Sequence, residues 1–138
     1  MRIFTYFILC LIASSPLSAG ELVLENGWVR AAPPMVKNLA GYGVLRNTSS
    51  HQVFIEKMNS PLFQKVEAHK TSFVNGMMKM QHMEEIAIAA GKALVFEPSG
   101  MHFMLVKPKQ PIIENLQVPL EITLRSGEVV RFTLIVKK

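Results

Sequence analysis

The 138-residue chain contains no aspartate, and its single cysteine, Cys10, lies near the N-terminus. The lack of aspartate argues against calcium, which requires a cluster of oxygen ligands. One cysteine cannot form an internal disulfide or a cysteine-rich zinc site. The lysines and arginines form no basic block interleaved with aromatic residues, so the net charge of +5 does not indicate nucleic-acid binding. The sequence also shows no nucleophile–base pair and no paired carboxylates, which argues against an enzyme.

The first 19 residues have the three parts of a secretory signal peptide. Met1 and Arg2 begin the chain with positive charge, residues 3–13 are an apolar run, and residues 14–19 end in small side chains. The apolar run is shorter than the roughly 20 residues that span a bilayer, so a membrane anchor is the weaker alternative. We therefore predict cleavage after residue 19 and export to the periplasm.

Cleavage would remove Cys10 and leave a domain, residues 20–138, without any thiol. Cys10 lies inside the apolar run, with no lipoprotein-type cleavage box before it, which argues against lipidation. A single domain of this length can bury a working core without disulfides.

The rest of the chain alternates short apolar runs with turn residues at roughly 8–12-residue spacing, and no amphipathic helix is indicated. Asn26-Gly27 and Asn75-Gly76 are typical of tight turns between adjacent strands. We predict an all-β, Greek-key β-sandwich or barrel in a single domain. The predicted strands are residues 22–24, 28–30, 39–46, 51–58, 63–69, 77–83, 86–90, 93–96, 102–106, 120–124 and 129–136.

Methionine is the unusual component of this sequence. Nine are present, and most lie between Met77 and Met104, close to histidines. A methionine in a strand is usually a flexible core filler, and this is the interpretation for Met77, Met78 and Met101. Methionine clustered beside histidine in an exported, thiol-free domain favours a site for a soft metal instead.

Four side chains are the candidate ligands: His69, Met80, His102 and Met104. If Asn75-Gly76 is the tip of a hairpin, His69 and Met80 lie about equally far from it on opposing strands, where Cβ atoms are roughly 5 Å apart. The spacing of two in His102-x-Met104 places both side chains on one face of a strand. The four candidates therefore form two local pairs that the fold must bring together.

Two thioethers and two imidazoles suit copper(I) better than zinc or calcium. Blue-copper electron transfer needs a cysteine thiolate, which residues 20–138 lack. His51 is interpreted as a surface or hydrogen-bonded residue. Whether Met78, His82 or Met83 joins the site as an accessory ligand stays open.

The spacing of these ligands resembles the signature of the periplasmic copper chaperone family PCu(A)C. Ten residues separate His69 from Met80, twenty-one separate Met80 from His102, and one separates His102 from Met104. Asn75-Gly76-Met77-Met78-Lys79-Met80 and Gly100-Met101-His102-Phe103-Met104-Leu105 resemble the segments around these ligands in the family. Trp28-Val29-Arg30 with Pro33-Pro34, and Ala40-Gly41-Tyr42 with Leu45-Arg46-Asn47, resemble its upstream landmarks.

Three positions depart from the family pattern. Lys70 follows the first histidine, where the family often has an acid, and Lys79 replaces the usual arginine. The chain ends at Lys138 without the His/Met-rich tail of some members, which puts a second, copper(II)-type site in doubt.

The resemblance implies a cupredoxin-like barrel that carries copper(I) outside the cytoplasm without being an enzyme. It also implies delivery towards the CuA centre of cytochrome c oxidase, with subunit II of the oxidase and a Sco-type protein as partners. Two alternatives remain: a periplasmic copper-buffering or tolerance protein without a delivery partner, and a metal-free β-sandwich interaction module. No stable membrane insertion after signal removal is expected.

Overall fold

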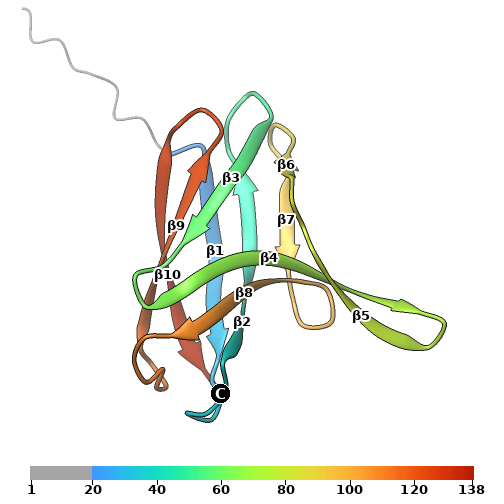
Figure 1. Cartoon of the computed structure of the whole chain (residues 1–138). Helices are drawn as coiled ribbons and strands as arrows, with labels where there is room; N and C mark the ends of the chain where they lie inside the picture. The colour runs from blue at the N-terminus through green and yellow to red at the C-terminus, as the bar shows by residue number, and fades with distance from the viewer. Residues whose placement is uncertain (1–19) are drawn as a thin grey trace, which may run out of the picture.

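The computed structural model describes residues 20–138, and the predicted signal peptide, with Cys10, lies outside the described residues. Residues 20–138 form ten β-strands and no helix (Figure 1). No helix long and apolar enough to cross a membrane is found in this part of the chain. The strands are β1 (Leu22–Arg30), β2 (Asn38–Asn47), β3 (Val53–Asn59), β4 (Phe63–Val74), β5 (Met77–His82), β6 (Ile86–Ile88), β7 (Ala93–Phe96), β8 (Met101–Pro108), β9 (Gln117–Leu124) and β10 (Val129–Lys137).

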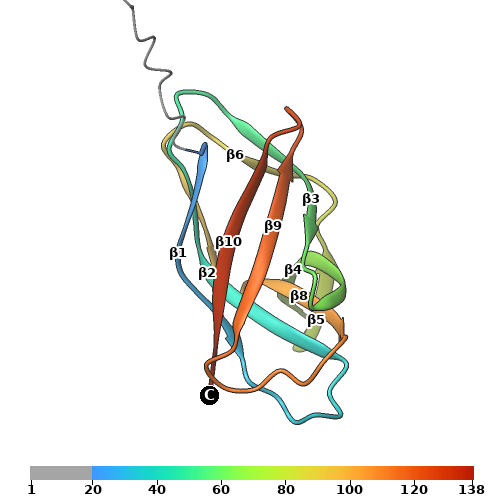
Figure 2. The same ribbon diagram turned by 90° about the vertical axis from the view of Figure 1, so that its left-hand side faces the viewer.

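The strands form one sheet that closes on itself. Their order is β5-β4-β8-β7-β2-β1-β10-β9-β3-β6, and a further pairing between β3 and β4 closes the barrel. Figure 2 shows β9 and β10 side by side along its near wall. β5 pairs with β4 alone and β6 with β3 alone, so these two strands lie outside the closed ring. The predicted all-β, single-domain fold is confirmed.

The barrel interior decides which face of β8 is available to the candidate site. Phe103 and Leu105 of β8 are fully buried, and the ring of Phe103 stacks on that of Phe96 with centroids 4.1 Å apart. Val66 and Ala68, their partners on β4, are buried with them. Because side chains alternate along a strand, the even-numbered residues of β8 face away from this core.

One predicted turn is wrong. Asn26-Gly27 does not separate two strands, because β1 runs unbroken from Leu22 to Arg30. Its register with β2 shifts between Glu25 and Trp28, and Asn26 has a φ of 52°. This is a β-bulge, which uses the same left-handed conformation that asparagine tolerates in turns. A Cβ on Gly27 would lie 2.8 Å from side-chain atoms of Leu24 and Leu134, so packing also requires glycine there.

The second Asn-Gly pair does form a hairpin. Asn75 and Gly76 have φ values of 52° and 74°, as a two-residue turn of the primed type requires, and Val74 pairs with Met77 across it. Beyond Lys70, β4 pairs only with β5, and every residue of β5 is exposed. Figure 1 shows this β4–β5 hairpin projecting from the barrel as an arm.

Gly76→Ala is expected to loosen the β4–β5 hairpin without disturbing the barrel. A Cβ at Gly76 meets nothing within 4 Å, so the cost is the left-handed backbone alone, about 1–2 kcal/mol. Amide hydrogen exchange in β5 should accelerate by roughly 5–30-fold.

Gly91→Ala is the matched control. Gly91 also has a positive φ, 69°, and open space around its Cβ, but it lies in the turn between β6 and β7. Faster exchange in β5 caused equally by both variants would contradict the local role of Gly76.

Candidate metal centre

The pairing of β4 with β8 brings the two candidate histidines together. His69 is directly opposite His102, and Glu67 is directly opposite Met104. Directly opposite residues share a face, so these four side chains lie on the face of the two strands that points away from the core. The rings of His69 and His102 are 5.9 Å apart between centroids. His102 is only 5% exposed, although it is not part of the barrel interior.

Met80 reaches the same face from the β4–β5 hairpin, but it is not the direct partner of His69. Met80 pairs with Thr71, and the residue opposite His69 is His82. The two-residue turn fixes this register, because it makes Val74 and Met77 the closing pair and every later pair follows from them. The expectation that His69 and Met80 lie equally far from the hairpin tip is therefore wrong. Met80 is a diagonal neighbour of His69 on the same face.

Three of the four predicted ligands line one cavity. Met80, His102 and Met104 border a space of about 380 Å³. Its other walls are Asn38, Leu39, Ala40, Tyr42, Thr71 and Ser99. His69 does not border this cavity and lies beside it, opposite His102 in the strand register. The fold thus gathers Met80, His102 and Met104 and places His69 next to them.

The His69 ring has one nitrogen engaged and one without a partner. Nε2 lies 3.1 Å from Glu67 Oε2, while Nδ1 is buried and makes no hydrogen bond. A buried nitrogen without a hydrogen-bond partner is costly in a protein that binds nothing there. Metal-binding histidines commonly donate their second ring N–H to a carboxylate, which directs the other nitrogen's lone pair at the metal. The environment of His69 fits that arrangement.

His102 is held in a similar way by a backbone oxygen. Its Nδ1 lies 3.3 Å from the Gly100 carbonyl, which accepts the hydrogen bond and leaves Nε2 as the possible ligand atom. Burial lowers the pKa of His102 below its ordinary value, opposed by the Gly100 carbonyl and aided by His69. The lowered pKa favours the neutral imidazole, which is the form that can bind a metal.

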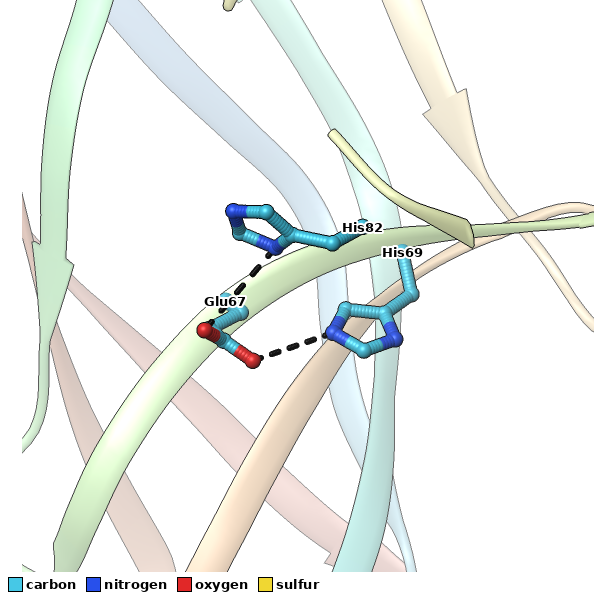
Figure 3. A group of neighbouring side chains, drawn as sticks. All are labelled: Glu67, His69 and His82. Carbon is cyan, nitrogen blue, oxygen red and sulfur yellow. Dashed lines mark hydrogen bonds and ion pairs between the residues drawn. The ribbon is translucent and has the colours of Figure 1, made fainter. Parts of the chain in front are cut away.

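Glu67 is the important residue that the sequence did not single out. Its carboxylate contacts Lys65 as well as His69. Its Oε1 lies 3.8 Å from His82 Nδ1, and Figure 3 shows the carboxylate between the two histidine rings. The ion pair with Lys65 is the main reason that the pKa of Glu67 is lowered. The period of two in Lys65-x-Glu67-x-His69 was the signal that these side chains share one face.

The fold and the family follow from comparison with known proteins. The profile of the LpqE-like lipoprotein family matches residues 22–136. The chain belongs to the LpqE-like family. No curated protein matches this chain.

Solved structures with the same fold include PCuAC domains. The copper-bound PCuAC domain from PmoF2 is 16% identical, with a TM-score of 0.69, over 86% of this chain and 93% of that domain. The copper(I) form of DR1885 from Deinococcus radiodurans is 25% identical, with a TM-score of 0.67, over 88% of this chain and 83% of that protein. The predicted cupredoxin-like fold and the resemblance to PCu(A)C domains are confirmed.

The shifted pKa values of His102 and Glu67 predict that the metal-free protein loses stability in acid. Because the pKa of His102 is lower in the folded protein, the unfolded chain protonates this histidine at a higher pH than the folded protein does. The free energy of unfolding therefore falls once the pH drops below about 6.5. The lowered pKa of Glu67 adds a loss at still lower pH. Urea unfolding between pH 7.5 and 5.5 should show a falling midpoint, with a shallower slope in His102→Gln. An equal slope in both proteins would contradict the assignment to His102.

Proposed function

We propose that this protein is an exported copper(I) carrier that binds one ion through His69, Met80, His102 and Met104. The observation that carries the proposal is the convergence of Met80, His102 and Met104 on one cavity, beside a histidine with a buried, unpartnered ring nitrogen. The copper-bound state of related PCuAC domains supports the same conclusion. Two neutral sulfur and two neutral nitrogen ligands match the softness of copper(I).

Each side chain has a separate task in this proposal. His102 is buried and oriented by Gly100, so it anchors the ion. His69 is oriented by Glu67, with Nδ1 as the donor to copper. Met80 is 54% exposed and belongs to the projecting hairpin, so it is the ligand most accessible to an incoming acceptor. Copper is the cargo here, and an acceptor can replace neutral ligands one at a time.

We further propose that the cargo goes to the CuA centre of cytochrome c oxidase, through subunit II and a Sco-type protein. Export through cleavage after residue 19 is part of this proposal, and membership of a lipoprotein family supports an exported location. No catalytic step is assigned, because a site filled by four protein ligands has no open position for a substrate.

Replacing His102 and Met104 together by alanine should abolish one-to-one copper(I) binding. The change removes both β8 ligands and should leave the barrel folded, because neither side chain belongs to its core. Copper(I) titration against a competing chelator measures the binding, and circular dichroism verifies the fold. Retained one-to-one binding by the folded double variant would refute the site.

Met80→Ala and Met78→Ala form a matched pair for the hairpin ligand. Both methionines are exposed residues of β5, at 54% and 65%, but only Met80 borders the cavity. We expect Met80→Ala to weaken copper(I) binding by about tenfold or more, equivalent to about 1.4 kcal/mol, and Met78→Ala to leave it unchanged. Equal losses would show that the hairpin methionines do not act individually.

A deletion strain separates delivery from copper buffering. If the protein delivers copper, the strain should assemble less cytochrome c oxidase at low copper, and added copper should restore it. Normal oxidase assembly with increased copper sensitivity would instead favour the buffering alternative. The metal-free interaction module would be supported if the purified protein bound no copper(I) at all.

A further inference from the structure

We propose that Glu67, His69 and His82 form a second metal site, specific for a divalent transition-metal ion and strongest for copper(II). The site shares His69 with the proposed copper(I) site, so the two ions compete. The inference that they compete rests on the proposed function, whereas the divalent site itself rests on the geometry of these three residues alone.

Their potential ligand atoms already lie close together. One atom from each of the three residues falls within 4.8 Å of the other two. His69 Nε2 is 3.1 Å from Glu67 Oε2, and His82 Nδ1 is 3.8 Å from Glu67 Oε1. A tetrahedral zinc(II) shell with bonds of about 2.0–2.1 Å separates its ligands by roughly 3.3 Å. Small side-chain rotations are therefore sufficient to close the shell around an ion.

The backbone holds these three residues in place. Glu67 and His69 are two apart on β4, and His82 is directly opposite His69 on β5. Figure 3 shows the imidazole rings of His69 from β4 and His82 from β5 beside the Glu67 carboxylate. The side chain of His82 is 47% exposed, which lets an ion enter and leaves coordination positions for water.

The ligand set selects a different ion from the proposed copper(I) site. It contains two imidazoles, one carboxylate and no sulfur, which suits zinc(II) and copper(II) better than soft copper(I). Copper(II) forms the strongest complexes of the divalent first-row ions with such ligands. The Lys65 ammonium forms an ion pair with Glu67 Oε1, but the Lys65 side chain is 62% exposed. Replacing this ion pair by a metal ion therefore costs little free energy.

Competition follows from the chemistry of one imidazole ring. A neutral imidazole has one ring nitrogen with a lone pair that can bind a metal ion, because the other nitrogen carries the proton. When Nε2 carries the proton it donates to Glu67, and Nδ1 is free for copper(I) beside His102. When Nδ1 carries the proton, Nε2 can join Glu67 and His82 around a divalent ion. Figure 3 shows the second ring nitrogen on the side of the ring away from Glu67, so the two nitrogens of His69 face different directions.

The test titrates the purified protein with zinc(II) and copper(II), and separately with copper(I). His82→Gln should weaken zinc(II) and copper(II) binding by about tenfold or more and leave copper(I) binding unchanged. The electron paramagnetic resonance spectrum of the copper(II) form should show one coupled imidazole fewer in this variant. Glu67→Gln provides a second variant, and it should also weaken the binding of divalent ions.

His51→Gln is the matched control. His51 Nε2 lies 2.9 Å from a carboxylate oxygen of Glu21, and the His51 side chain is 61% exposed. His51 is therefore another accessible histidine beside a carboxylate, and no second histidine lines the surface pocket that it borders. The His51→Gln variant should bind zinc(II) and copper(II) like the unaltered protein. An equal loss in His51→Gln and His82→Gln would mean that any exposed histidine binds these ions, which would overturn the site.

Loading with copper(I) under anaerobic conditions should reduce zinc(II) uptake to well below one equivalent. Simultaneous binding of one equivalent of each ion would overturn the shared role of His69. A weaker copper(I) affinity in His82→Gln would assign His82 to the copper(I) site and overturn the separate site. If copper(I) fails to bind while zinc(II) binding depends on His82, the proposed function fails and the divalent site stands.

Discussion

The register between β4 and β8 is the constraint on which the candidate site depends. Val66 and Ala68 face the same interior as Phe103 and Leu105, and the burial of these four side chains fixes how the two strands align. A slip of one residue would turn a row of apolar side chains out of the core, so it is strongly disfavoured. The same alignment places His69 opposite His102. The packing energy of the barrel interior therefore positions the chemistry on its outer face.

Exposure increases across the proposed copper(I) ligands from the barrel to the arm. His102 is buried against the barrel, Met104 is half-buried, and Met80 is exposed on a hairpin held by a single neighbouring strand. A carrier has to hold its ion firmly and still release it to a partner. Rigid ligands on a closed barrel and an accessible ligand on its edge satisfy both needs, since the elements least supported by packing open most readily.

Glu67 links the two sites inferred for this face. Its carboxylate orients His69 for one ion and is itself a ligand for the other. A neutral imidazole can bind a metal ion through one ring nitrogen or through the other, but not through both at once. The chemistry of this face thus depends on one ring and on which of its nitrogens carries the proton.

Local patterns in the sequence were sufficient for several features. Alternating apolar residues predicted the strands, and Asn75-Gly76 predicted the hairpin, because turn conformation and side-chain alternation depend on neighbouring residues only. The spacing in His102-x-Met104 likewise placed both side chains on one face. The same local signal failed at Asn26-Gly27, where β2 and β10 pair along β1 and turn the expected hairpin into a bulge.

The contacts between β4 and β8 emerge only in the folded barrel. His69 opposite His102, Glu67 opposite Met104, and the unpartnered Nδ1 of His69 all depend on register and burial, whereas the local hairpin turn is sufficient to place His82 opposite His69. The register is set by the pairing of β4 with β8 around the buried core, which joins segments far apart in the sequence. Residue types and their local spacing identified the kinds of ligand and the strands that carry them. Packing of the closed barrel determined their partners, because the energy that selects a register comes from the whole core rather than from the strand itself.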